Sequence, residues 1–155
     1  MSEIDLVLVN ETDNCTIYTL QFEGENETEF ESFYNKFKDD AVYNPDLMRI
    51  VAFINKIAKD GAFERLFRPE GKMSDHVVAL PVITSKLRLY CLRLSDKILI
   101  LGNGGVKKSR TYNEDDNLRG YVITLQNFEK LLKEGQKKGL VTITEKTIEI
   151  KDENF

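Results

Sequence analysis

Positively charged side chains gather in the middle of this chain, and they are the residues best suited to chemistry on a phosphate. Residues 61–113 contain ten Lys or Arg and four Asp or Glu, a net charge of +6 in a chain whose overall charge is −4. Residues 1–60, by contrast, carry a net charge of −8. A cationic segment in an acidic protein favours a phosphate-bearing partner. The alternative is that these cations balance the acidic first third of the chain.

Two apolar runs, 87–94 and 98–101, flank Ser95-Asp96-Lys97 and predict a β-hairpin. A period of two along the first run assigns alternate residues to opposite faces of the strand, a buried face with Leu87, Leu89 and Cys91 and an opposite face with Lys86, Arg88 and Tyr90. The alternation fails at residues 92–94, which a β-bulge would explain. After the second run, the glycine-rich residues 102–105 predict a flexible turn that delivers the next cations beside the hairpin.

The order of an arginine-bearing strand, a short turn, a strongly apolar strand and a Val-Lys-Lys signature resembles the RelE/ParE superfamily of bacterial toxins. Within it, the chain is most similar to the RelE- and HigB-like, phage-associated branch. The residues that carry the resemblance, which covers roughly residues 15–118, are Arg88, the run 98–101 and Val106-Lys107-Lys108-Ser109. Three features depart from the family: relatives tend to have a larger residue than Gly104-Gly105, carboxylates follow at residues 114–116, and ribosome-acting relatives are usually basic overall.

The resemblance implies the toxin of a type II toxin–antitoxin system, which cleaves mRNA on the ribosome without a metal or another cofactor. In that scheme a 2′-hydroxyl attacks the adjacent phosphate, so the site needs cations, a base and an acid. The resemblance implies these catalytic roles for Arg88, Lys107 and Lys108, with the guanidinium of Arg88 as a bidentate phosphate clamp. The implied partners are a cognate antitoxin protein and mRNA on the ribosome, with no membrane.

Further side chains are candidates for RNA contacts. Arg110, Tyr112 and Tyr90 are close enough in sequence to contact a phosphate or stack on a base. The family's habit of carrying cations in the preceding turn adds Arg68 and Lys72.

Each candidate also has a purely structural interpretation. Arg88 could be a surface cross-strand cation, Lys107 and Lys108 a solvated turn, and Tyr90 a packed tyrosine. His76, just before a predicted strand, is best interpreted as structural or exposed. For the whole protein, the alternative to an endoribonuclease is a non-catalytic binding protein of the same fold that acts through protein or nucleic-acid contacts.

The remaining elements predict an α+β fold, in which an antiparallel sheet meander carries an N-terminal helix pair on one face. Residues 15–22 predict a strand, and residues 4–9 an extra edge strand. A capping box of Thr28 and Glu31 starts a helix over residues 28–39. The second helix, residues 45–59, has Asn44 as N-cap and Gly61 at its end.

The rest of the chain predicts a strand over residues 77–83, interrupted by Pro81, and then the hairpin. A helix over residues 121–135 and one or two strands over residues 140–150 follow. We therefore expect one domain, residues 1–155, with a RelE-like core at 15–118 and a C-terminal extension at 119–155.

Composition agrees with an ordinary globular protein, since 41% of the residues are hydrophobic. No apolar run approaches the roughly 20 residues that span a bilayer, and the N-terminus lacks the basic region of a signal peptide. We therefore expect the protein in the cytoplasm. Cys15 and Cys91 are expected to be reduced and buried, and one histidine with two scattered cysteines gives no zinc spacing.

Overall fold

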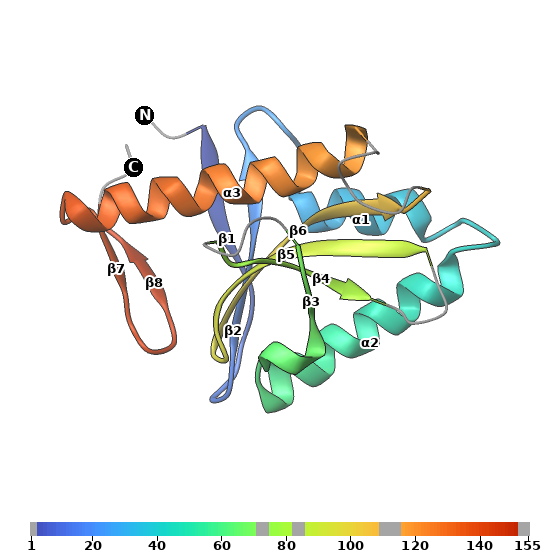
Figure 1. Ribbon diagram of the computed structural model, residues 1–155, viewed down its shortest axis with the longest axis horizontal. Helices are drawn as coiled ribbons and strands as arrows, with labels where there is room; N and C mark the ends of the chain where they lie inside the picture. The colour runs from blue at the N-terminus through green and yellow to red at the C-terminus, as the bar shows by residue number, and fades with distance from the viewer. Residues whose placement is uncertain (1–2, 71–74, 82–85, 109–115, 152–155) are drawn as a thin grey trace.

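The computed structural model describes residues 3–70, 75–81, 86–108 and 116–151 (Figure 1). Within these ranges the strands form a six-stranded sheet in the order β1-β2-β6-β5-β4-β3 and a separate two-stranded sheet, β7-β8. The elements in chain order are β1 (Ile4–Glu11), β2 (Thr16–Phe22), α1 (Glu29–Phe37), α2 (Asn44–Asp60), the 3₁₀ turn η1 (Glu64–Leu66), β3 (Arg68–Pro69), β4 (Val77–Pro81), β5 (Leu87–Ser95), β6 (Ile98–Val106), α3 (Asp116–Lys137), β7 (Val141–Ile143) and β8 (Ile148–Ile150).

The α+β class is confirmed, but the large sheet is mixed rather than antiparallel. β2 runs parallel to β6, with Thr16 opposite Ile98 and Thr19 opposite Leu101, whereas the other adjacent strands are antiparallel. The connection between them is long, since it includes α1, α2 and the strands β3, β4 and β5, and parallel strands cannot be joined by a short hairpin. The predicted extra edge strand is confirmed as β1, which forms a hairpin with β2.

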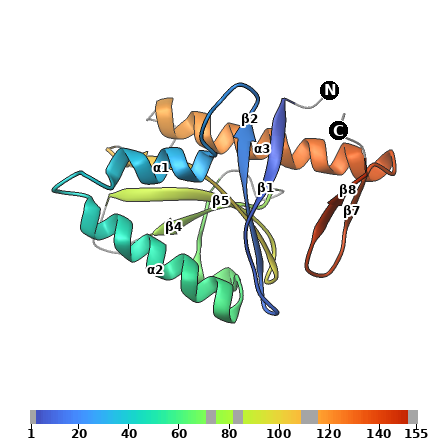
Figure 2. The same cartoon turned by 180° about the vertical axis from the view of Figure 1, so that it is seen from behind.

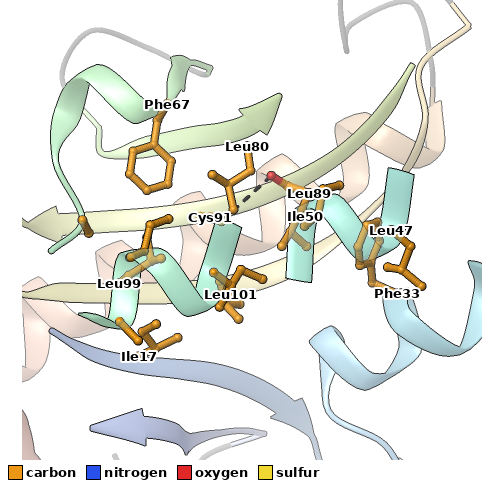
Figure 3. Packing of buried hydrophobic residues seen from close by; sticks show 14 of the residues in the cluster. Ile17, Phe33, Leu47, Ile50, Phe67, Leu80, Leu89, Cys91, Leu99 and Leu101 are labelled. Carbon is orange, nitrogen blue, oxygen red and sulfur yellow. Dashed lines mark hydrogen bonds between the residues drawn. The ribbon is translucent and has the colours of Figure 1, made fainter. Parts of the chain in front are cut away.

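The expected helix pair packs on one face of the large sheet. The capping box of α1 is present, because Thr28 Oγ1 accepts from Glu31 N and the Glu31 carboxylate accepts from Thr28 N. α2 begins at Asn44, one residue before the predicted start; the Asn44 side chain instead donates to Lys38 O at 2.6 Å and closes the turn between the helices. The two helices and the sheet share one core (Figure 3), which includes Phe33, Phe37, Leu47, Ile50, Ile54, Ile57, Ile17, Leu89, Cys91, Leu99 and Leu101.

The opposite face of the sheet is covered by α3, so that α2 and α3 lie on opposite sides of the strands (Figures 1 and 2). α3 is longer than the predicted helix and packs on a second core, which includes Tyr18, Leu20, Tyr90, Leu92, Ile98, Ile100, Leu118, Val122, Leu125 and Phe128. Both faces of β5 are therefore buried. This explains why the apolar alternation fails at Leu92, because a strand that is buried on both faces need not alternate.

β5 and β6 pair with two irregularities. The pairs Arg93–Leu99 and Ser95–Ile98 leave Leu94 as an extra residue on β5, which confirms the expected bulge. The pairs Leu89–Gly104 and Cys91–Leu101 leave one extra residue on β6. The glycine-rich residues 102–105 are therefore part of strand β6 and not the expected flexible turn. The close approach of two strands at this bulge, and not conformational freedom, is what requires glycine there.

Two further predictions have a structural outcome. Cys15 and Cys91 are both free and buried, as expected. Among the described residues, no helix is long and apolar enough to cross a membrane.

Candidate functional site

Arg88 lies in the middle of the large sheet, on the face that α3 covers. Its neighbours across the strands are Pro81 of β4 and Gly105 of β6, and its Nη1 donates to Leu87 O at 3.0 Å. The residue is only 9% exposed, so the interpretation of Arg88 as a surface cross-strand cation is wrong. The cause is α3. Its Leu118 side chain lies over Gly105, which is the residue of β6 paired with Arg88. Burial, and then Arg68, lower the pKa of the Arg88 guanidinium.

Strand pairing brings Arg68 to the same face as Arg88. Arg68 is opposite Ala79 of β4, which is opposite Tyr90 of β5, and paired residues in a sheet point to the same side. Arg68 and Arg88 therefore lie on the same face of the sheet. The Arg68 side chain is exposed, whereas that of Arg88 is buried.

Lys107 and Glu70 complete this group, which we call the cation cluster: Arg68, Glu70, Arg88 and Lys107. Lys107 N donates to Lys86 O at 2.6 Å, so the ladder between β5 and β6 continues past Val106. Glu70 N donates to Val77 O at 3.0 Å, which ties the end of β3 to β4. The charges of the four residues act on one another: Arg68, Arg88 and Lys107 each affect the pKa of Glu70.

The environment brings the pKa values of Glu70 and Lys107 closer together. Burial raises the pKa of the Glu70 carboxyl, and the three cations oppose that change. Burial lowers the pKa of the Lys107 ammonium, Glu70 opposes this, and Arg68 and Arg88 add to it. A carboxyl that protonates more readily beside an ammonium that deprotonates more readily is an arrangement suited to proton transfer.

The structure divides the predicted lysine pair. Lys107 belongs to the cation cluster, whereas Lys108 lines a separate pocket of about 270 Å³ between α1, the end of β6 and the start of α3. We call this the α1–α3 pocket. A second lysine, Lys36 of α1, also lines it.

The other candidates have different outcomes. Tyr90 is fully buried in the core under α3, so it is a packed residue and is not placed to stack on a base. Lys72, Arg110 and Tyr112 lie outside the described residues.

Glu70 and Lys36 were not predicted. Glu70 had a readable signal, since it lies two residues after Arg68 in an extended segment and so shares its side. The sequence contains no signal for Lys36, because its position in the α1–α3 pocket depends on α1 lying beside β6.

His76 has a structural partner, as expected. Its ring Nδ1 contacts Glu129 Oε2 of α3, and its backbone N donates to Glu129 Oε1 at 3.1 Å. Glu129 is only 4% exposed, and Lys133 Nζ lies 3.8 Å from its Oε2. The pair therefore fastens the start of β4 to α3.

Replacing His76 with alanine is expected to destabilise the protein by about 1–3 kcal/mol, because a buried carboxylate loses a hydrogen-bond partner. Chemical unfolding in urea measures this change. The control is His76→Gln, whose amide can still donate to Glu129 and should restore most of the lost stability. Equal stability of His76→Ala and the wild type would show that the pair does not stabilise the fold.

Comparison with family models, curated proteins and solved structures finds no match to this chain. Among the described residues, no group of three or more His, Cys, Asp or Glu side chains is arranged to hold a metal ion.

Proposed function

We propose that this protein is a toxin-like, metal-free endoribonuclease that cleaves mRNA on the ribosome, and that residues 15–118 form a RelE/ParE-like core. The observation that carries the proposal is the cation cluster. Two arginines and a lysine act on one half-buried carboxyl, although like charges repel and burial of an arginine is costly. Such a concentration of perturbed ionisable groups is typical of functional sites.

The cluster contains the groups that the reaction needs. We assign the Glu70 carboxylate as the base that takes the proton of the 2′-hydroxyl. The bond from O2′ to phosphorus then forms, the bond from phosphorus to O5′ breaks, and the product ends in a 2′,3′-cyclic phosphate. Lys107 donates a proton to the leaving O5′. Arg68 and Arg88 stabilise the added negative charge on the phosphoryl oxygens.

The cellular setting follows from this proposal. A ribosome-bound substrate places the protein in the cytoplasm, and the resemblance to RelE/ParE toxins implies an antitoxin that blocks the same surface. The exposed Arg68 is the part of the cluster that such a partner could reach first.

A second candidate is a non-catalytic binding protein of the same fold. The burial of Arg88 favours it, since a side chain that is 9% exposed has little area for a phosphate. The overall charge of −4 also favours it. In this alternative the buried arginine supports the sheet, and binding uses the exposed cations.

Cleavage of mRNA by the purified protein on programmed ribosomes separates the two candidates. The endoribonuclease should produce fragments with a 2′,3′-cyclic phosphate, and its activity should survive chelation of divalent ions after the ribosome complexes have been chemically cross-linked. No cleavage by folded wild-type protein would leave the binding protein as the better candidate.

The pH dependence of cleavage should follow the pKa directions of Glu70 and Lys107. Glu70 must be deprotonated, so the rate rises with pH through its pKa, which is above the usual glutamate range. Lys107 must be protonated, so the rate falls as pH rises through its pKa, which is below the usual lysine range. Single-turnover rates should therefore give a bell that is narrower than ordinary side chains would produce.

Variants assign the two limbs of that bell. Glu70→Gln should remove the acid limb and lower the rate by about 10²–10⁴-fold, the usual contribution of a positioned base. Lys107→Met should remove the alkaline limb. A pH profile unchanged in shape by both substitutions would contradict the assigned proton transfers.

A further inference from the structure

We propose that the α1–α3 pocket binds the RNA phosphate next to the one that is cleaved. This inference rests on the proposed function and extends it to a second phosphate, held by Lys36 and Lys108. Three elements that are far apart in sequence build the pocket, and one of them, α3, lies almost entirely beyond residues 15–118. The pocket therefore gives the C-terminal extension a role in binding.

Lys36 is held in a fixed position at the pocket. Its Nζ donates to Gly104 O at 2.7 Å and to Tyr121 Oη at 2.9 Å. It also lies 4.7 Å from the centre of the Tyr121 ring. An ammonium has three N–H groups, so the two hydrogen bonds to described residues leave a third N–H to donate to a ligand oxygen. A lysine that is already oriented loses less conformational entropy when an anion binds.

The end of β6 makes the pocket polar as well as cationic. β2 pairs with β6 as far as Leu101, so beyond that residue the described part of β6 pairs with β5 alone. Side chains form hydrogen bonds with the backbone of Gly104 at this edge. Asn103 Oδ1 accepts from Gly104 N at 2.8 Å, and Lys36 Nζ donates to Gly104 O. The same edge contains Gly104 and Gly105, which line the pocket with backbone atoms alone.

Charge in the pocket favours an anion. Lys36 and the exposed Lys108 supply two cations. A carboxylate that interacts with Lys36 is Glu29 at the start of α1, on which Asn103 also acts. Burial raises the pKa of Glu29, and Lys36 opposes that change. Among the described residues that line the pocket, the charged side chains are both lysines, which a phosphate diester can neutralise.

The position of the pocket relative to the cation cluster indicates which phosphate it binds. Lys107 and Lys108 are consecutive residues, with Cα atoms about 3.8 Å apart. Lys107 joins the cation cluster, and Lys108 lines the α1–α3 pocket. An RNA strand that crosses the end of β6 therefore passes from one cationic group directly to the next. Successive phosphates of one strand are the ligand that fits two neighbouring cationic groups.

The test is binding of an uncleavable RNA, made with 2′-O-methyl riboses, to the full chain at increasing KCl concentrations. Lys108→Ala and Lys36→Ala should each make the slope of log affinity against log salt shallower by about 0.7, the value for one contact to single-stranded nucleic acid. The matched control is Lys38→Ala, which removes the same charge from an exposed position near the end of the same helix. Its slope should equal that of the wild type.

A neutral methylphosphonate at the neighbouring position identifies the phosphate. If Lys108 contacts it, wild-type protein should lose affinity for the modified RNA, and Lys108→Ala should lose almost nothing more. Additive losses, or slopes that equal the wild type's, would overturn the inference, and so would a wild type that does not bind the RNA. If Lys36→Ala melts at a lower temperature than the wild type, Lys36→Gln replaces it in the binding measurement. If the protein binds this RNA but does not cleave mRNA, the proposed reaction is overturned. The combined effect of Lys108→Ala and the methylphosphonate on affinity would still show whether the α1–α3 pocket binds the neighbouring phosphate.

Discussion

Arg88→Ala is expected to lower the rate of mRNA cleavage by about 10²–10³-fold, the usual effect of removing one donor that stabilises charge in a transition state. The guanidinium would donate to phosphoryl oxygens whose negative charge develops during attack, so substrate affinity should change less than the chemical step. Single-turnover cleavage on programmed ribosomes, with wild type and variant side by side, measures the effect. In cells, the same variant should no longer arrest growth.

The burial of Arg88 requires a second variant in this experiment. Alanine removes both the hydrogen bond to Leu87 O and much of the volume under α3, so part of its effect could come from the fold. Arg88→Met retains most of the aliphatic volume without the charge and should be equally inactive while it unfolds cooperatively. Lys86→Ala, at an exposed residue just before β5, is the charge-matched control. Full cleavage by Arg88→Met would remove Arg88 from the site.

The second large effect is expected on stability. In Gly104→Ala the new Cβ would lie 1.9 Å from Arg88 O, a backbone atom that cannot move without shifting β5. We expect a loss of at least about 3 kcal/mol, the upper end of the cost of over-packing, because the two strands must separate at the bulge. Urea unfolding, followed by circular dichroism, measures the free energy.

Gly105→Ala is the matched control, since it adds the same methyl group one residue further along β6. Its Cβ would meet Leu118 Cδ2 at 3.3 Å, the end of a flexible side chain that can shift by a few tenths of an ångström. The control should therefore unfold at nearly the wild-type urea concentration. If both variants were equally stable, the pairing of Leu89 with Gly104 would be wrong.

Local signals in the sequence were sufficient for the helix pair and for the two faces of β5. The capping box of Thr28 and Glu31 acts within one turn of α1, and Gly61 directly follows the last residue of α2. The opposite sides of Leu89 and Arg88 follow from the period of two in any strand. These features depend on neighbours in sequence, so no tertiary contact was needed to predict them.

The tertiary structure alone decided whether the second face of the sheet was exposed and where the cations lie. Periodicity places Arg88 and Leu89 on opposite faces of β5. It cannot show that a helix about 30 residues later covers the face with Arg88. The same holds for Lys107 and Lys108, which join separate groups because α1 and α3 flank the end of β6. Glu70 and Lys36 reach these groups through strand pairing and helix packing. Contacts between residues that are distant in the chain depend on the whole packed arrangement, which no local pattern in the sequence contains.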